Sequence, residues 1–246
     1  MLEHPFLLPL SFIVTTLVCV GWLLYSLSFK LSRAGTIIVA SLLSVLMLVQ
    51  GSLAASGFYF YFAAVPPRFF LVVAPSLITL ILLVALPSRN MLMRLPLRHL
   101  TAVHMVRIPV ELILWWLYHE GYVPRLMTFE GGNIDILAGL SAPFVVWLGF
   151  QDAYTYTQTQ RRVLLIWNSL MILLLANILV RAVLSLPVSF QQFAFAQPNI
   201  AVNAFPFVWL PAVIVPIVIF CHVVSLLQLV REPRHEHSST QLLSSQ

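Results

Sequence analysis

Three ionisable side chains lie inside an apolar stretch near the middle of the chain. His104, Arg107 and Glu111 are three and four residues apart, so on a helix they share one face. A charge at the centre of a membrane-spanning helix costs about 2.5–3.5 kcal/mol on insertion scales. Such groups persist where they face a protein interior or a wet cavity and find partners. Arginine matches carboxylate or phosphate groups, and histidine or glutamate can carry a proton. The stretch therefore predicts a polar site within a membrane.

The same helix face continues beyond Glu111 through Trp115 and Tyr118. Arg107 and Glu111 are four residues apart and could pair, which would neutralise both charges. That pair could be a purely structural contact between helices, or the core of a functional site. Pro109 lies between them and cannot donate a backbone hydrogen bond. We expect it to kink the helix beside His104 and Arg107.

Further polar residues fall at similar depth in neighbouring apolar stretches. Asp135 follows Glu130, Gly131, Gly132 and Asn133, where it could complement a helix dipole or face the same cavity as Glu111. Asn177 and Arg181 are four apart on one face of a later stretch. A buried arginine needs an anion, and the candidates for Arg181 are Glu111 and Asp135. The predicted ligand-binding set is His104, Arg107, Glu111, Trp115, Tyr118, Asp135, Asn177 and Arg181.

His222, in the last apolar stretch, is expected at the same depth as His104. By the helical rise, His222 lies about 12 Å and His104 about 10 Å from the same membrane surface. The two rings could ligate a metal or a haem iron, which would make the protein an intramembrane enzyme or redox protein. A retinal Schiff base is not expected, because the only lysine, Lys30, is not in the last stretch. The sequence contains no H-E-x-x-H, Walker or dinucleotide-binding motif.

Seven apolar segments could position these residues. They run over residues 7–27, 36–57, 69–86, 97–118, 134–150, 163–186 and 207–230. Each approaches the roughly 20 residues needed to cross a bilayer core of about 30 Å. Hydrophobic residues make up 60% of the chain and charged residues 9%, which excludes an ordinary water-soluble domain. We predict an all-α, seven-helix membrane bundle over residues 1–231 and a polar cytoplasmic tail over 232–246.

The distribution of basic residues predicts the orientation. Alternate connections carry nine of the thirteen lysines and arginines, against Arg68 and Arg125 on the opposite side. The positive-inside rule then places the N-terminus outside and the C-terminus in the cytoplasm. The net charge of +5 reflects this bias and does not indicate nucleic-acid binding. The last outer connection, residues 187–206, is aromatic and uncharged, and could be either an interfacial belt or a lid over a cavity.

Three functions fit these patterns. The first is an integral protein of a plasma or bacterial inner membrane that transports or senses a small ligand, such as an anion, at the polar site and does not act as an enzyme. The second is the metal or haem protein using His104 and His222. The third is a structural membrane protein whose polar network specifies packing alone. In each case the lipid bilayer is the partner that surrounds the chain. Signalling would also require a separate membrane or cytoplasmic protein.

Overall fold

The computed structural model describes residues 6–85, 92–150 and 155–231. Within these ranges the chain is helical and contains no β-strand. The all-α prediction is confirmed to that extent. The predicted tail over 232–246 lies outside the described residues, as do Arg89 and Arg234 of the charge analysis.

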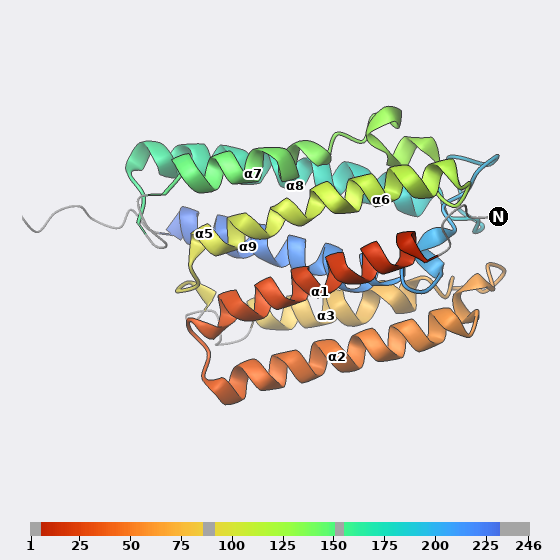
Figure 1. Ribbon diagram of the computed structural model, residues 1–246, viewed down its shortest axis with the longest axis horizontal. Coiled ribbons are helices and arrows are strands. Elements are labelled where there is room, and N and C mark those ends of the chain that lie inside the picture. Colours follow the sequence, from red (N-terminus) through yellow and green to blue (C-terminus); the bar gives the residue numbers. More distant parts are fainter. Residues whose placement is uncertain (1–5, 86–91, 151–154, 232–246) are drawn as a thin grey trace, which may run out of the picture.

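The helices run side by side, and successive ones alternate in direction except for the short α5 and α6, which follow one another along the same line, as Figure 1 shows. They are α1 (Leu7–Ser28), α2 (Arg33–Ala55), α3 (Phe70–Ala85), α5 (Leu97–Ala102), α6 (Arg107–His119), α7 (Ile136–Leu148), α8 (Gln158–Leu184) and α9 (Val215–Arg231). Short helical turns are η1 (Phe58–Phe60), η2 (Val103–Val106), η3 (Arg125–Met127), η4 (Phe129–Gly131), η5 (Ala201–Asn203) and η6 (Leu210–Ile214). The turn η2 joins α5 to α6, so these three elements form one continuous rod over Leu97–His119. The turn η6 leads into α9, so these two form another over Leu210–Arg231.

Five of these rods are long and apolar enough to cross a membrane: α1, α2, Leu97–His119, α8 and Leu210–Arg231. The helices α3 and α7 are shorter and lie within the same bundle. Leu97–His119 and Leu210–Arg231 are the most buried of the five and form its centre, whereas α2 is the least buried. Large apolar side chains such as Ile38, Leu42 and Leu48 are exposed on α2. Such a continuous apolar exterior requires lipid as its solvent. The chain is therefore compatible with an integral membrane protein.

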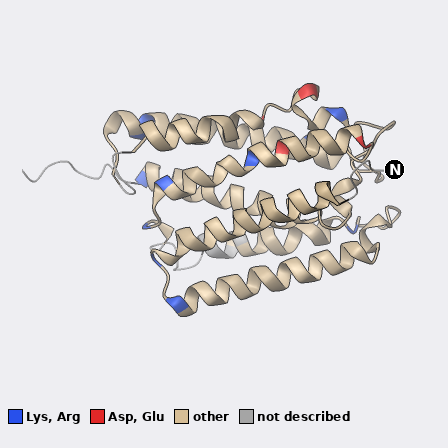
Figure 2. Ribbon diagram, viewed as in Figure 1, with Lys and Arg blue, Asp and Glu red and all other residues tan. Residues whose placement is uncertain are grey.

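Charged side chains gather at the two ends of the bundle (Figure 2). One end, here the basic end, is where α1 and α9 end and α2, α5 and α8 begin, so it carries Lys30, Arg33, Arg94, Arg98, Arg161, Arg162 and Arg231. The opposite end, here the loop end, is where α6 and α8 end and α3 and α7 begin, so it carries Arg68, Arg125, Glu120, Glu130 and residues 187–206. The separation agrees with the charge pattern from which the orientation was predicted.

Prolines inside the helices leave backbone carbonyls free, and side chains from neighbouring helices bind two of them. Pro75 in α3 removes the N–H that would bond the Leu71 carbonyl, and Gln50 Nε2 of α2 donates to that oxygen at 3.1 Å. Pro216 in α9 likewise leaves the Ala212 carbonyl free, and Ser76 Oγ of α3 donates to it at 2.5 Å. These bonds tie α3 to both neighbours, since a bilayer offers no water to replace them.

Candidate functional site

The Leu97–His119 rod, called the central rod below, changes its helix type where the polar face begins. α5 ends at Ala102, η2 forms one tighter turn over Val103–Val106, and α6 starts at Arg107. Pro109, in the first turn of α6, cannot continue the hydrogen-bond ladder back to the preceding turn. A 3-10 turn thus lies directly before the segment where the sequence predicted a kink, and His104 lies in this turn, three residues before Arg107.

Arg107 is almost fully buried, and its guanidinium joins three other helices. Nη1 donates to Asp135 Oδ1 at 2.9 Å and to the Met171 carbonyl at 3.4 Å, and Nη2 contacts His222 Nε2 at 3.2 Å. Arg107–Asp135 is the only ion pair in the part of the chain that the structure describes. The predicted Arg107–Glu111 pair is wrong, because Asp135 at the start of α7 approaches the guanidinium instead.

The contact to Arg107 fixes the proton position on His222. Arginine is only a donor, so His222 Nε2 must accept. Nδ1 therefore carries the proton and donates to Asn168 Oδ1 at 2.9 Å, while Asn168 Nδ2 donates to the Leu164 carbonyl. Asn168 and His222 thus form a polar chain that reaches Arg107 from the basic end of the bundle. Sequence patterns did not connect them, since they lie on different helices.

His104 stacks on His222, which confirms that the two histidines share a depth. Their ring centroids are 3.9 Å apart with an interplanar angle of 23°, and Trp167 contacts the His104 ring edge-on at 5.4 Å. Neither His104 nitrogen has a hydrogen-bond partner within the described residues, although the side chain is fully buried. The two rings face each other, so their nitrogen lone pairs do not point to a common position. Both His222 nitrogens already have partners, Arg107 and Asn168. This arrangement does not favour a shared metal ion.

A second carboxylate lies one helical turn beyond Arg107. Glu111 accepts from Asn133 Nδ2 through Oε1 at 2.7 Å and Oε2 at 2.9 Å. The same amide nitrogen donates to the Met127 carbonyl, and Asn133 Oδ1 accepts from the Asp135 backbone N–H at 3.1 Å. Asn133 therefore aligns both acidic residues at the entry to α7. Glu111, Asn133 and Asp135 are all buried.

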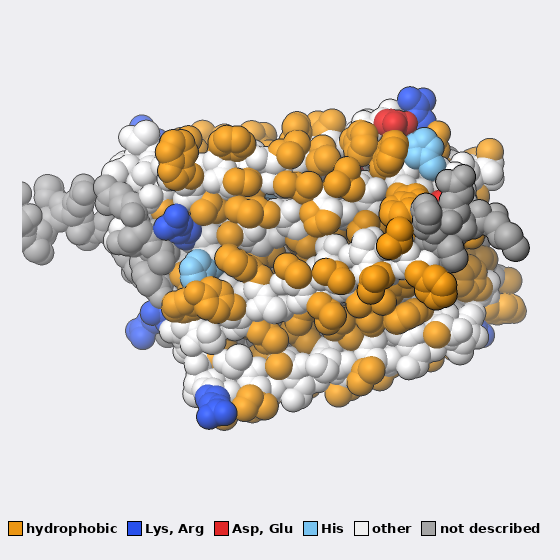
Figure 3. Space-filling view, in the orientation of Figure 1, with side chains coloured by type: hydrophobic (Ala, Val, Ile, Leu, Met, Phe, Trp, Pro, Cys, Tyr) orange, Lys and Arg blue, Asp and Glu red, His pale blue; other side chains and the backbone are white. Residues whose placement is uncertain are grey.

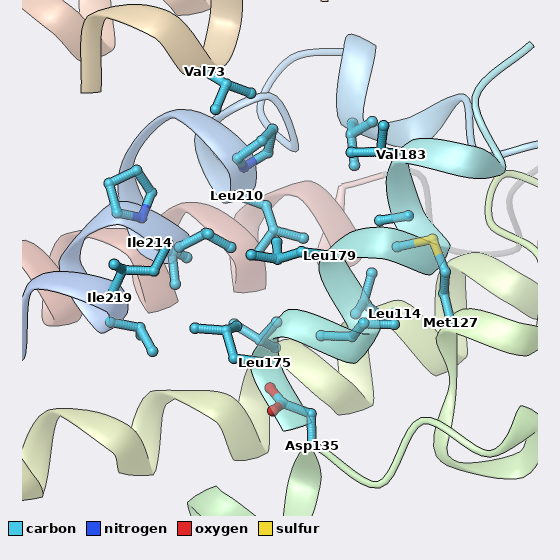
Figure 4. Close-up of a pocket in the computed structure, with 18 of the residues that line it drawn as sticks. Val73, Leu114, Met127, Asp135, Leu175, Leu179, Val183, Leu210, Ile214 and Ile219 are labelled. Atoms are coloured by element: carbon cyan, nitrogen blue, oxygen red, sulfur yellow. The ribbon is translucent and has the colours of Figure 1, made fainter. Parts of the chain in front are cut away.

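A cavity of about 210 Å³ adjoins these groups between α3, α6, α8 and the η6–α9 rod. Arg107, Glu111 and Asp135 are its charged lining residues. Figure 4 shows Asp135 at one side and aliphatic side chains, including Leu175 and Leu179, around the space. The surface of the cavity is thus almost entirely apolar, and the three charged residues adjoin it at one side.

Residues 187–206 contribute to this cavity at the loop end. Asn199 and Val202 are among its lining residues, and both are buried. The backbone N–H groups of Ile200 and Ala201 donate to the Tyr122 carbonyl, which holds the segment against the end of α6. Asn199 Oδ1 is buried without a hydrogen-bond partner in the described chain, so it is an unused acceptor at the cavity wall. Its role was missed because no periodic pattern marks a loop residue that folds inward.

The remaining predicted site residues lie outside the cavity lining. Trp115 is partly buried and donates from Nε1 to Glu130 Oε1 at 2.7 Å, and the Tyr118 carbonyl accepts from Gln197. Arg181 donates to the Gly131 carbonyl and to Asn177 Oδ1, each at 3.3 Å. The prediction that Arg181 pairs with Glu111 or Asp135 is wrong. Arg181 lies nearer the loop end, where it braces the turn that precedes Asp135.

Comparison with known protein families, curated proteins and solved structures finds no match to this chain.

Proposed function

We propose that this chain is a seven-span integral membrane protein that binds a small molecule in the cavity beside Arg107, Glu111 and Asp135. The observation that carries the proposal is the position of three buried ionisable groups at one side of a chamber whose surface is almost entirely apolar. Structural ion pairs need no adjoining space, whereas binding sites combine an apolar pocket with a few polar groups. Binding is the step common to transport and sensing, and either would use this site.

The cavity volume limits the size of the ligand. A cavity of about 150 Å³ lined by aliphatic and aromatic groups holds one benzene molecule. At about 210 Å³, this chamber has room for a ring of that size with a short polar substituent. Larger ligands would require the loop segment around Asn199 to move.

The polar groups beside the cavity favour a ligand that donates hydrogen bonds. Both terminal nitrogens of Arg107 are already engaged by protein groups, which weakens the case for the anionic ligand expected from the sequence. An ionised carboxylate offers about four acceptor sites, more than the hydrogen bonds between described residues occupy on Glu111 and Asp135. Asn199 Oδ1 adds another free acceptor, while Arg107 Nε is a free donor. A hydroxyl group could use both kinds of site.

Three phenyl compounds of similar size test this proposal: phenylethanol, phenylethylamine and phenylacetate. The measurement is the melting temperature of the full chain in lipid nanodiscs. At ten times its dissociation constant a ligand stabilises by about 1.4 kcal/mol, which corresponds to a rise of about 3–6 °C. We expect the alcohol or the amine to produce this rise, and phenylacetate to produce little.

A cavity-filling substitution distinguishes binding in the chamber from partitioning into lipid. Ala182 lines the cavity, whereas Ala176 is exposed on the same helix α8. Ala182→Phe should abolish the ligand-induced rise, and Ala176→Phe should preserve it. Equal shifts in both variants, or no shift with any compound, would reject the cavity as a binding site and favour a network that specifies packing alone.

The proposed orientation places the loop end outside and the basic end in the cytoplasm, in a plasma or bacterial inner membrane. Ser189 is exposed at the loop end and Ser28 at the basic end, while the native Cys19 and Cys221 are buried. A membrane-impermeant maleimide should label Ser189→Cys in intact cells and Ser28→Cys only after permeabilisation. The reverse pattern would invert the topology.

A further inference from the structure

A second, larger cavity opens on the side of the bundle, away from the polar site. This lateral groove has a volume of about 600 Å³. Val14, Val18 and Trp22 of α1 form one wall, Val146 of α7 contributes to the other, and Ala102 and Met105 of the central rod are among the floor residues. The wall residues of α1 are all at least 39% exposed. Figure 3 shows this face, where hydrophobic side chains cover the middle and basic side chains lie toward the ends.

The groove has the length of one membrane leaflet. Its floor runs along the central rod from Arg98 to Pro109, eleven residues that rise about 16 Å. Half of a hydrocarbon core of about 30 Å is about 15 Å. The groove therefore extends from the basic end to the middle of the bilayer, which is the reach of one acyl chain.

An unpaired arginine and an unpaired histidine nitrogen, as far as the structure describes the chain, lie where the groove reaches the basic end. Arg98 lines it and forms no ion pair within residues 6–85, 92–150 and 155–231. The basic end also carries no aspartate or glutamate among the residues that the structure describes. His99 Nδ1, beside Arg98, is buried and makes no hydrogen bond in the same part of the chain.

Aromatic residues hold this end of the groove in place. Trp22 Nε1 donates to the His99 carbonyl at 3.0 Å, and the His99 ring stacks on Tyr25 with centroids 5.4 Å apart. Phe29 contacts the same ring edge-on at 4.9 Å. Tryptophan and tyrosine concentrate at the headgroup level of bilayers. The cluster therefore marks the depth at which a lipid headgroup would lie.

We propose that the lateral groove binds one anionic phospholipid from the leaflet at the basic end. The acyl chain lies against Ala102, Met105 and Val18, and the phosphate accepts hydrogen bonds from Arg98. The phosphate gives Arg98 an anionic partner, which no described residue provides, and the chain covers the apolar floor between α1 and α7. This site is separate from the cavity beside Glu111 and does not depend on what that cavity binds.

Native mass spectrometry of delipidated protein in detergent tests the proposal, with dioleoyl-phosphatidylglycerol and dioleoyl-phosphatidylcholine as probes. We expect one phosphatidylglycerol to bind more tightly than phosphatidylcholine. Arg98→Gln should lower the affinity for phosphatidylglycerol by about fivefold, the usual effect of one basic residue near an anionic surface. The matched control is Arg94→Gln, since Arg94 is exposed at the same end and does not line the groove.

Two further variants separate the headgroup from the chain. Arg98→Lys keeps the charge and should retain most of the affinity, which excludes misfolding as the cause of the loss. Ala102→Phe fills the floor and should reduce the binding of both lipids. Equal losses in the two glutamine variants, equal affinity for the two lipids, or displacement by inorganic phosphate alone would overturn the proposal.

Discussion

Removal of the Asp135 carboxylate charge tests whether the buried Arg107 guanidinium depends on that single anion. The two side chains are 4% and 7% exposed and meet at 2.9 Å. At an effective dielectric constant of about 20, that separation corresponds to about 6 kcal/mol of attraction before desolvation is counted. Breaking a buried pair by removing one partner typically costs about 3–5 kcal/mol, because the other charge stays buried. Asp135→Asn keeps the size of the side chain and leaves Arg107 uncompensated.

We therefore expect Asp135→Asn to lower the melting temperature by about 6–20 °C, at about 2–4 °C per kcal/mol for a chain of this size. The assay is fluorescence-detected size-exclusion chromatography of heated, detergent-solubilised protein. The matched control is Glu130→Gln, which alters an exposed carboxylate that contacts only Trp115 in the described structure. We expect this control to change stability by less than about 1 kcal/mol.

A loss in Asp135→Asn no larger than that of Glu130→Gln would refute the reasoning, since Arg107 would then be neutralised by another group or hydrated. The double variant Arg107→Met with Asp135→Leu provides a second check. Buried ion pairs can be replaced by apolar residues of similar volume with little loss of stability. The double variant should therefore be more stable than Asp135→Asn alone, although Glu111 would remain as the only charged group among the described lining residues of the cavity.

The remaining predictions concern helix packing and can be measured by the same melting assay. A Cβ atom at Gly139 in α7 would lie 2.8 Å from Ile108 Cγ1 and 2.9 Å from the Ile108 backbone nitrogen, so Gly139→Ala should cost about 1–3 kcal/mol. Gly21 in α1 has no atom within 4 Å of such a Cβ, so Gly21→Ala should instead stabilise by about 0.5–1 kcal/mol. Ser76→Ala leaves the Ala212 carbonyl without its donor and should cost about 1–3 kcal/mol. Thr79→Ala, which alters an exposed hydroxyl on the same helix, should stay within about 0.5 kcal/mol.

The sequence determined the helices and their polar faces with considerable accuracy. Each of the seven predicted segments corresponds to a helix, and the fourth, predicted over 97–118, appears as Leu97–His119. Hydrophobic length and the spacing of His104, Arg107 and Glu111 follow from chain geometry alone, so a single sequence reveals them. The equal depth of His104 and His222 followed from the same count of residues and is confirmed by their stacked rings.

Only the tertiary structure decided which charges meet. The pairing of Arg107 with Asp135 depends on how α7 enters the bundle, which the Asn133 side chain helps to set through contacts to both Glu111 and Asp135. Arg181 remained outside the cavity because its position along α8 brings it to the Gly131 carbonyl. The sequence pattern shows which residues share a helix face. It does not show which neighbouring helix that face meets, or how a connecting loop folds. For that reason neither the unused acceptor of Asn199 nor the groove beside Arg98 could be read from the sequence, whereas helix length and helix face could.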